Sequence, residues 1–297
     1  MTIVLNYLRM ILIMKLLAAV LLLLAPALAA CGSGGSDQGT TVVTSIYPLE
    51  FVAKAVAGDH ADVVDLTHPG AEPHDLELSV SQTAQVIDAD VVVYLPGFQA
   101  AVDDAVGQTD GNTVVDASDS AGLQGDDPHF WLDPTRLAAV AGQVADGLSK
   151  ADPAHAHDYA RNAAVLERRL GALDKEISAG LSDCERDAVV VSHDAFEYFA
   201  ERYGLRVYPI AGLSPDTEPS PEHIAQLQQL IRDEGITTVF SETLASPKMA
   251  DTLSSDLGLH TAVLDPVEGL SDATADEDYF SLMRENLAAL QKANGCR

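Results

Sequence analysis

Short β-rich runs alternate with helical stretches in two separate blocks of this chain, and this pattern constrains the fold most. In the first block the strand-like runs cover residues 42–46, 61–66, 91–95 and 113–116. In the second block they cover residues 188–191, 206–210, 237–240 and 261–264. Several of the intervening helical stretches end at a glycine, such as Gly58, Gly204 and Gly258. Strands that alternate with helices predict an α/β fold of two lobes with mostly parallel sheets.

One long amphipathic segment separates the two blocks. Apolar residues recur at spacings of three and four from Tyr159 to Leu181, and Pro153 suits a first helical turn. The spacing predicts a helix over residues 153–181, about 43 Å long at 1.5 Å per residue. A coiled-coil arm is the alternative, but the apolar seam is short for one. We therefore predict a connecting helix between an N-terminal lobe over 41–152 and a C-terminal lobe over 182–297.

The N-terminal segment has the pattern of a secretory signal. An apolar run follows Lys15, and residues 1–30 end before Cys31 in a sequence that resembles a bacterial lipobox. Cleavage there and acylation of Cys31 would anchor the protein outside the cytoplasm, on the cell membrane, through a flexible tether over residues 31–40. A retained transmembrane helix is the alternative, but the run is short for a span of about 20 residues. Met14 is the expected start of translation.

The composition is strongly acidic. Lys and Arg number 17 against 45 Asp and Glu, which gives a formal net charge of −28 at pH 7. Because contacts to phosphates need Lys and Arg, we expect no nucleic-acid partner. A solvated acidic surface explains this charge, and a weak field that concentrates cations would be an additional effect.

The cysteines suit an oxidising compartment. Of the three, Cys31 is assigned to the lipid, which leaves Cys184 and Cys296. We predict a disulfide between them that ties the end of the chain to the start of the second lobe. Zinc ligation by these cysteines is the alternative, although neither has a partner at Cys-x-x-Cys spacing.

Three histidines on loops rich in proline and acidic residues indicate a metal site. His74 follows Pro73, His129 follows Pro128, and His193 comes directly after an apolar strand-like run. Asp265 likewise follows the run that ends at Leu264. Ligands of open α/β sheets bind beyond the carboxyl ends of strands, so these four side chains are expected to line one crevice between the lobes. Three imidazoles and one carboxylate form a ligand set that suits zinc.

Each of these residues also has an ordinary interpretation. A single histidine on a loop is commonly just a polar side chain, and Asp265 before Pro266 is typical of a turn or a cap. Only their joint placement favours a metal site. His68, which lies close to His74 in the sequence, is the reserve ligand.

Five segments add a resemblance to a known family: residues 73–77, 127–134, 192–199, 202–205 and 264–266. In combination they resemble the zinc- and manganese-binding lipoproteins of bacterial ABC importers, the ZnuA/TroA-type solute-binding proteins. The resemblance runs from about residue 41 to the C-terminus. It implies two α/β lobes joined by one long rigid helix, with the metal in the cleft between them. It also implies ligation by His74, His129, His193 and Asp265.

The family's metals and partners follow from the same resemblance. Manganese members typically carry a carboxylate where this chain has His193, so zinc is expected in preference to manganese. The expected partner is an ABC permease of the membrane, and the expected state is a monomer. Glu72 and Glu242 lie where members keep acidic residues near the site, and we expect them to support the ligands. Many zinc members carry a long His-rich loop, whereas residues 117–127 here are short and contain no histidine.

Two other classes of function remain open beside zinc delivery to a permease. A zinc-dependent hydrolase would use Asp265 as a base and keep a water on the metal. The chain has no His-Glu-x-x-His helix, no Gly-x-Ser-x-Gly elbow and no phosphate-binding loop. A binding protein for an organic ligand would need a pocket rich in aromatic side chains, which make up 5% of this chain. We therefore expect a binding protein and no enzymatic activity.

Overall fold

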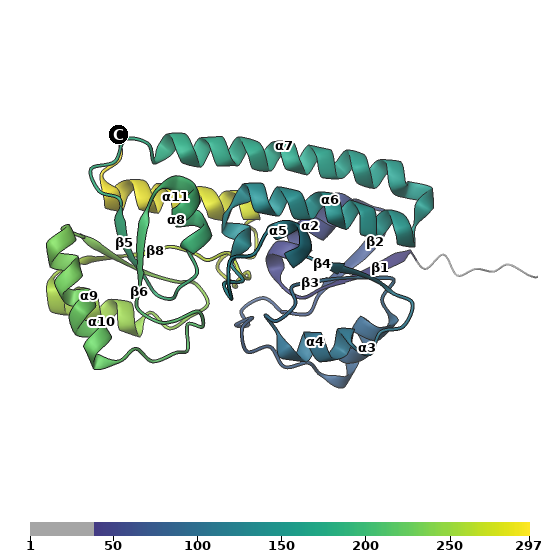
Figure 1. Ribbon diagram of the computed structural model, residues 1–297, viewed down its shortest axis with the longest axis horizontal. Helices are drawn as coiled ribbons and strands as arrows, with labels where there is room; N and C mark the ends of the chain where they lie inside the picture. The colour runs from purple at the N-terminus through teal and green to yellow at the C-terminus, as the bar shows by residue number, and fades with distance from the viewer. Residues whose placement is uncertain (1–38) are drawn as a thin grey trace, which may run out of the picture. The chain divides into compact units, whose positions relative to one another are not determined.

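The computed structural model describes residues 39–297 (Figure 1). The predicted signal over residues 1–30, the start at Met14, the lipidation site Cys31 and nearly all of the tether lie outside the described residues. Within residues 39–297, no helix is both long and apolar enough to cross a membrane. This part of the chain forms two four-stranded sheets in which every neighbouring pair of strands is parallel, which confirms the predicted α/β fold.

The first sheet has the strand order β2-β1-β3-β4. Its strands are β1 (Thr40–Thr44), β2 (Ala61–Asp65), β3 (Val91–Tyr94) and β4 (Thr113–Asp116). One face is covered by α2 (Tyr47–Ala57) and α6 (Pro134–Ala151), and the other by α3 (Val80–Asp88) and α4 (Ala100–Val106) (Figure 1). Val42 and Val43 of β1 belong to the cores on opposite faces. Burial on both faces explains the continuous apolar run of the central strand β3, in which Val91, Val92 and Val93 are all buried.

Helix α6 was not predicted from the sequence, although it leads from the metal-site loops to the connector. The helix begins after Asp133, whose side chain accepts a hydrogen bond from Thr135 N at 2.8 Å, and Pro134 occupies the first turn. A short helix α5 (Ser118–Ala121) and the 3-10 turn η2 (Phe130–Leu132) precede it. The Asp-Pro pair was the visible start signal of this helix.

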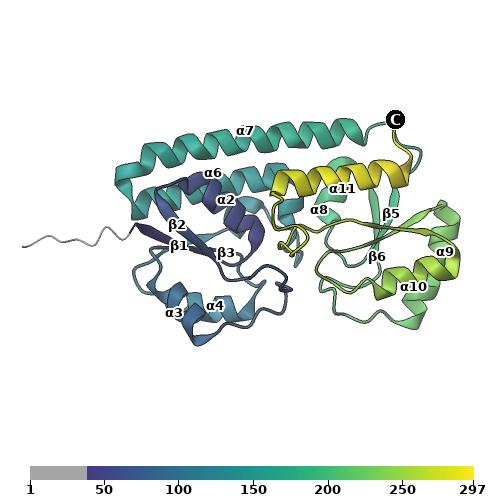
Figure 2. The same ribbon diagram turned by 180° about the vertical axis from the view of Figure 1, so that it is seen from behind.

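The connector is α7 (Ala156–Gly180), which follows a 3-10 turn, η3 (Pro153–His155). It packs on α2 and α6 beside the first sheet and on α11 (Tyr279–Asn294) beside the second (Figures 1 and 2). Its buried side chains follow the predicted spacing of three and four: Tyr159, Ala163, Leu166, Leu170, Leu173 and Ile177. The helix therefore lies along both lobes and is not a free arm.

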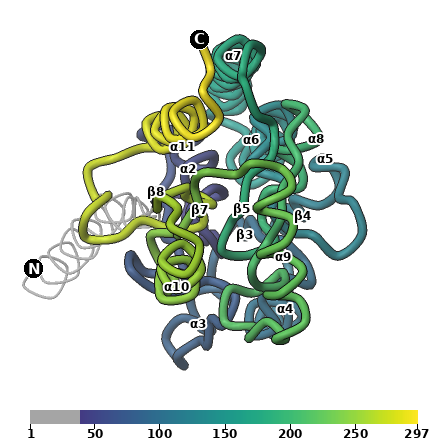
Figure 3. The backbone as a smooth tube through the Cα atoms, turned by 90° about the vertical axis from the view of Figure 1, so that its left-hand side faces the viewer, coloured from purple at the N-terminus to yellow at the C-terminus, as the bar shows by residue number. Residues whose placement is uncertain are grey.

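The second sheet repeats the first, with the strand order β6-β5-β7-β8. Its strands are β5 (Ala188–Val191), β6 (Arg206–Pro209), β7 (Thr238–Ser241) and β8 (His260–Val263). On one face lie α9 (Pro221–Glu234) and α10 (Lys248–Leu257), and on the other lie α8 (Glu197–Tyr203) and α11. Figure 3 shows the layers end-on, with α7 and α11 on one side of the strands and α9 and α10 on the other. β6 is an edge strand, as Pro209 predicted.

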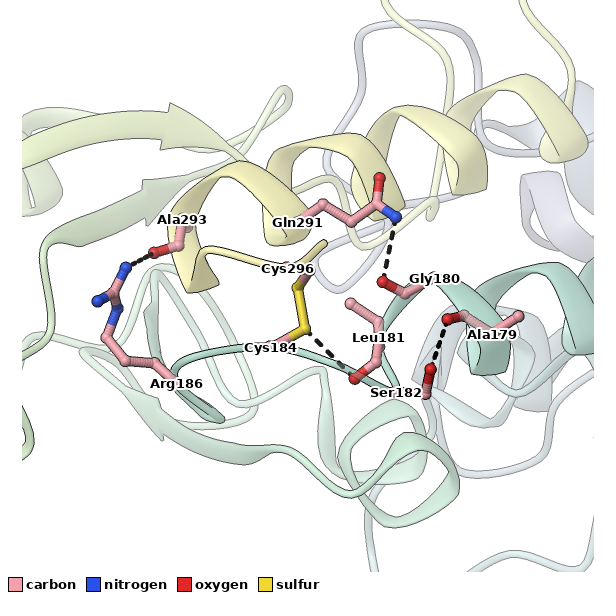
Figure 4. Close-up of a disulfide and its surroundings, with 9 residues drawn as sticks. All are labelled: Ala179, Gly180, Leu181, Ser182, Cys184, Arg186, Gln291, Ala293 and Cys296. Atoms are coloured by element: carbon pink, nitrogen blue, oxygen red, sulfur yellow. Dashed lines mark hydrogen bonds between the residues drawn. A yellow bond between two sulfur atoms is a disulfide. The ribbon is translucent and has the colours of Figure 1, made fainter.

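A disulfide between Cys184 and Cys296 fixes the end of the chain, as predicted (Figure 4). Because both sulfurs are used in this bond, the two cysteines do not form a zinc site. Nearby, the Gln291 amide donates to Gly180 O at 3.1 Å, and the Arg186 guanidinium donates to Ala293 O at 3.0 Å. The C-terminal end of α11 is thereby tied to the end of α7 and to the segment that leads into β5.

Both sheets change their winding direction at the centre. The first strand of each sheet pairs with the second on one side and with the third on the other. Loops that leave the carboxyl ends of such strands diverge, and the gap between them is the usual ligand site of open α/β sheets. The predicted metal ligands lie in the segments that follow β2, β4, β5 and β8, and of these strands β5 is one of the two between which the direction changes.

Candidate metal centre

The side chains that meet at this site come from four loops, of which three follow a strand and one follows the short helix α5. His74 lies between β2 and α3, and His129 lies between α5 and η2. His193 is two residues beyond β5, and Glu268 is five residues beyond β8. Two loops thus come from each lobe.

The three imidazoles and the Glu268 carboxylate face one another. The Nε2 atom of His129 is 3.4 Å from that of His74 and 3.3 Å from that of His193. Oε1 of Glu268 lies 2.9 Å from Nε2 of His129, 3.3 Å from Nε2 of His193 and 3.4 Å from Nε2 of His74. In the described part of the chain, these four residues form the one group of three or more His, Cys, Asp or Glu residues whose metal-ligating atoms all lie within 4.8 Å of one another.

This spacing corresponds to a tetrahedral coordination shell. An ion held about 2.0–2.1 Å from four donors places those donors roughly 3.3–3.4 Å from one another. Four of the five separations given above are 3.3 or 3.4 Å, and the fifth is shorter at 2.9 Å. The donors therefore need little movement to accept one ion of the size of zinc.

The far nitrogens of two of the histidines are held by carboxylates. Nδ1 of His129 donates to Asp127 Oδ1 at 2.7 Å, and Nδ1 of His193 donates to Glu242 Oε1 at 2.7 Å. The same oxygens accept the backbone N–H groups of His129 and His193, at 3.0 and 3.1 Å. A proton kept on Nδ1 directs the Nε2 lone pair toward the cluster, which is the orientation that metal ligation needs.

The electrostatics of the cluster favour the protonated forms of His129 and His193 beside an ionised carboxylate. Burial alone would lower the pKa of His193, but its hydrogen bonds with Glu242 and Glu268 outweigh burial and raise the pKa to about 10. The pKa of His129 is also raised, because hydrogen bonds with Asp127 and Glu268 outweigh its burial. Burial would raise the pKa of Glu268, but the three histidines hold it well below its usual range. A cation that binds here has to displace protons.

The structure brings Glu268, and not Asp265, to the histidines. Oδ1 of Asp265 accepts the backbone N–H of Val267 at 2.7 Å, and its Oδ2 accepts a hydrogen bond from the Thr243 hydroxyl. The Asp265 carboxylate therefore closes a turn, which was its ordinary interpretation from sequence. That turn carries the chain round so that Glu268, three residues later, points into the cluster.

The other predicted residues lie at different distances from the cluster. Glu242 contacts His193 directly, as described above. Glu72 accepts the backbone N–H of His74 at 3.0 Å, and both its burial and the charge of Glu268 raise its pKa. His68 is exposed and lies outside the cluster. The hydrogen bond from His129 to Asp127 was not predicted from the sequence, although the position of Asp127 two residues before His129 was a usable signal for it.

Known proteins whose sequences are similar to this chain are named for zinc binding or zinc uptake. Residues 42–293 match the family described as "ZnuA: Zinc-uptake complex component A periplasmic". Zinc-binding protein AdcA of Streptococcus pyogenes serotype M1 is 35% identical over 283 residues, which cover 84% of this chain and 55% of that protein. High-affinity zinc uptake system protein ZnuA of Bacillus subtilis strain 168 is 33% identical over 297 residues, which cover 89% of this chain and 92% of that protein. This chain thus spans about half the length of the streptococcal relative and most of the Bacillus one.

Solved structures share the fold. The Zn(II)-bound ZnuA-like domain of Streptococcus pneumoniae AdcA is 34% identical, with a TM-score of 0.75 over 86% of this chain and 99% of that chain. Laminin binding protein Lmb of Streptococcus agalactiae is 31% identical, with a TM-score of 0.79 over 86% of this chain and 99% of that chain. With a family match that covers both lobes and the connector, this chain belongs to the ZnuA family of zinc-uptake components.

Proposed function

We propose that this protein binds one Zn²⁺ ion outside the cytoplasm and delivers it, as a monomer, to an ABC-type permease of the membrane. The observation that carries the proposal is the buried set of three imidazole nitrogens and one carboxylate oxygen at tetrahedral spacing. The proposed ligands are His74, His129, His193 and Glu268, with Glu268 in place of Asp265. The names of the relatives, zinc-binding protein and zinc uptake system protein, support zinc as the cargo.

The donor set favours zinc over manganese. Manganese prefers oxygen ligands and octahedral sites, whereas zinc accepts imidazole nitrogen in a tetrahedral shell. Three of the four donors here are imidazole nitrogens, and two of the three histidines are fully buried. Further oxygen donors for a six-coordinate manganese ion would have to come from water or from a rearranged loop.

The same donor set argues for binding without catalysis. A catalytic zinc usually has three protein ligands and keeps the fourth position for water, whereas four protein ligands close the shell. Asp265, the base that a hydrolase would need, has both carboxylate oxygens in hydrogen bonds to Val267 and Thr243. A zinc ion held in this way is suited to storage and transfer.

The ion can reach the site from one side. A cavity of about 380 Å³ beside the cluster is lined by residues of both lobes, including His74, Asp126, Asp127 and Leu213. The side chain of His74 is 10% exposed, whereas the side chains of His129 and His193 are fully buried. His74 is therefore the ligand that an arriving ion meets first.

Membrane attachment through Cys31 is part of the proposal. The lipobox-like sequence before this cysteine supports it, as does the name of a relative from Streptococcus pneumoniae serotype 4, zinc-binding lipoprotein AdcA, which is 34% identical over 290 residues. A lipid on Cys31 and a short tether would keep the metal site close to the membrane and its permease. Mass spectrometry of the protein from membranes would show the acylated cysteine as the first residue.

Zinc binding is tested by competition with a chromophoric chelator, on a soluble fragment that starts at Ser36. We expect one tightly bound zinc per chain and loss of tight binding in His129→Ala. His157→Ala is the matched control, because His157 is exposed on α7 and lies outside the cluster. Weak binding that neither substitution changes would refute the proposal.

A further inference from the structure

The segment that carries Glu268 follows β8 of the second sheet, but its hydrogen bonds to Trp131 and Gly70 hold it to the N-terminal lobe. We define residues 266–270 as the bridging loop, which leaves β8 and leads toward α11. Trp131 Nε1 donates to Pro266 O at 2.8 Å, and Gly70 N donates to Leu270 O at 2.6 Å. Both ends of the bridging loop are thus bonded to the N-terminal lobe, and residues 264–269 are all buried.

Val267, within this loop, has an unfavourable backbone conformation. Its φ is 57°, and it is the one residue other than glycine with a positive φ in residues 39–297. A β-branched side chain disfavours this left-handed region strongly, so the surrounding structure has to hold it there. The Val267 side chain is completely buried, and its N–H is bonded to Asp265 Oδ1 at 2.7 Å.

The anchor of this turn is a buried residue of α11. The Asn286 side chain accepts Asp265 N at 2.7 Å and donates to Asp265 O at 2.6 Å. Asn286 of the C-terminal lobe thereby fixes Asp265, while Trp131 of the N-terminal lobe holds Pro266. Both fixed residues directly precede Val267. Because Glu268 directly follows Val267, the left-handed turn at Val267 sets the direction in which the carboxylate points.

Trp131 connects two of the proposed ligands. It lies two residues after His129, and its ring centroid is 5.3 Å from that of the His129 imidazole. Its carbonyl accepts the Tyr279 hydroxyl of α11 at 2.6 Å, while its indole holds the bridging loop. Loss of the indole bond would leave a buried carbonyl without its partner.

We propose that Val267 is a strained pivot and Trp131 the latch that holds it, and that together they position Glu268 against the three histidines. When the latch opens, Val267 returns to an ordinary backbone conformation and withdraws the carboxylate. The ion is then left with three imidazoles and is released more easily. This inference rests on the proposed zinc function and adds the element that moves during release.

The pivot is tested by comparing zinc release from Val267→Gly and Val267→Ala. Both substitutions remove the buried methyl groups, but only glycine removes the cost of a positive φ. If the strain is relieved on release, the glycine variant transfers zinc to excess chelator roughly three- to tenfold more slowly than the alanine variant. Equal rates would mean that residue 267 keeps its left-handed conformation throughout, and would overturn the pivot.

The latch is tested with Trp131→Phe, which keeps an aromatic ring and removes the donor. We expect zinc release to become about tenfold faster. The same substitution in a Glu268→Ala background should then add no further acceleration, because the latch acts through Glu268. An equal acceleration in both backgrounds would show a general structural effect and refute the latch.

These outcomes separate the inference from the function on which it rests. A wild-type protein that does not bind zinc one-to-one would refute the proposed function itself. A wild-type protein that binds zinc, with release rates that do not distinguish glycine from alanine at position 267, would refute only the pivot.

Discussion

Protons should compete with zinc at this site, so the affinity for zinc should rise steeply with pH. The pKa of His193 is raised to about 10, which means that its imidazole is protonated at neutral pH when no ion is bound. Ligation needs a neutral Nε2, so the proton has to leave. A pH of 7 is about three below this pKa. The free energy needed to remove the proton therefore weakens zinc binding at pH 7 by roughly 10³-fold, or about 4 kcal/mol.

The raised pKa of His193 also determines the direction and the steepness with which zinc affinity changes with pH. Because the pKa is raised, the competition is strongest at low pH and disappears as the pH rises through about 10. Between pH 7 and 8.5, His193 alone should increase the affinity about tenfold per pH unit. His129, whose pKa is also raised, is a second group whose proton zinc has to displace, so the slope should be steeper wherever both imidazoles are protonated.

The assay is chelator competition between pH 6 and 8.5, corrected for protonation of the chelator. Calorimetry at pH 7 in two buffers of different ionisation enthalpy would count the protons released, and we expect at least one per zinc. Glu242→Gln is the informative variant, because Glu242 helps to raise the pKa of His193 and is not a proposed ligand. Its affinity should depend less on pH above 7. A wild-type affinity that is flat from pH 7 to 8.5, without proton release, would refute this electrostatic account.

Three further predictions concern stability and the support of the ligands. Replacing Cys184 and Cys296 by serine should lower the free energy of unfolding by up to about 4.7 kcal/mol, because the disulfide joins residues that are 112 apart in the sequence. Urea unfolding in the presence of a chelator measures this loss. A loss below about 1 kcal/mol would contradict the prediction. Gly147→Ala should lower the free energy of unfolding by roughly 1–3 kcal/mol, because the added Cβ would meet the Val115 side chain. Gly171→Ala, which has open space around it in α7, should raise the free energy of unfolding by roughly 0.5–1 kcal/mol. Equal shifts in the melting temperatures of the two variants would be inconsistent with this packing. Asp127→Asn should weaken zinc binding roughly 10- to 100-fold in chelator competition, because the Asp127 carboxylate orients His129, and an unchanged affinity would rule out that role.

Much of the fold was predictable because the central strands β1, β3, β5 and β7 are buried on both faces. A continuous apolar run such as Val91-Val92-Val93 is typical of a strand that helices cover on both faces of a sheet. Each strand predicted from the sequence overlaps a strand of the structure. The connector was predictable for a similar reason, since its apolar residues repeat over many turns. The helix α6 was not predicted, although its start signal, Asp133-Pro134, forms the end of the motif around His129.

The site was predictable where a ligand lies close to the element or motif that positions it. His193 follows β5 by two residues, and strand position alone put it at the carboxyl end of the sheet. Glu268 is different, because its direction depends on a left-handed turn at Val267 that is held by Asn286 and Trp131. Trp131 is 135 residues from Pro266 in the chain, so no local pattern indicates this contact.

The identity of the four ligands is the central claim, and a crystal structure of the zinc-loaded protein with anomalous data at the zinc edge tests it most directly. We expect one zinc ion about 2.0–2.2 Å from Nε2 of His74, His129 and His193 and from a carboxylate oxygen of Glu268. Asp265 should remain bonded to Val267 N and the Thr243 hydroxyl. A zinc ion coordinated by Asp265, with Glu268 turned away, would contradict both the ligand set and the role of the bridging loop.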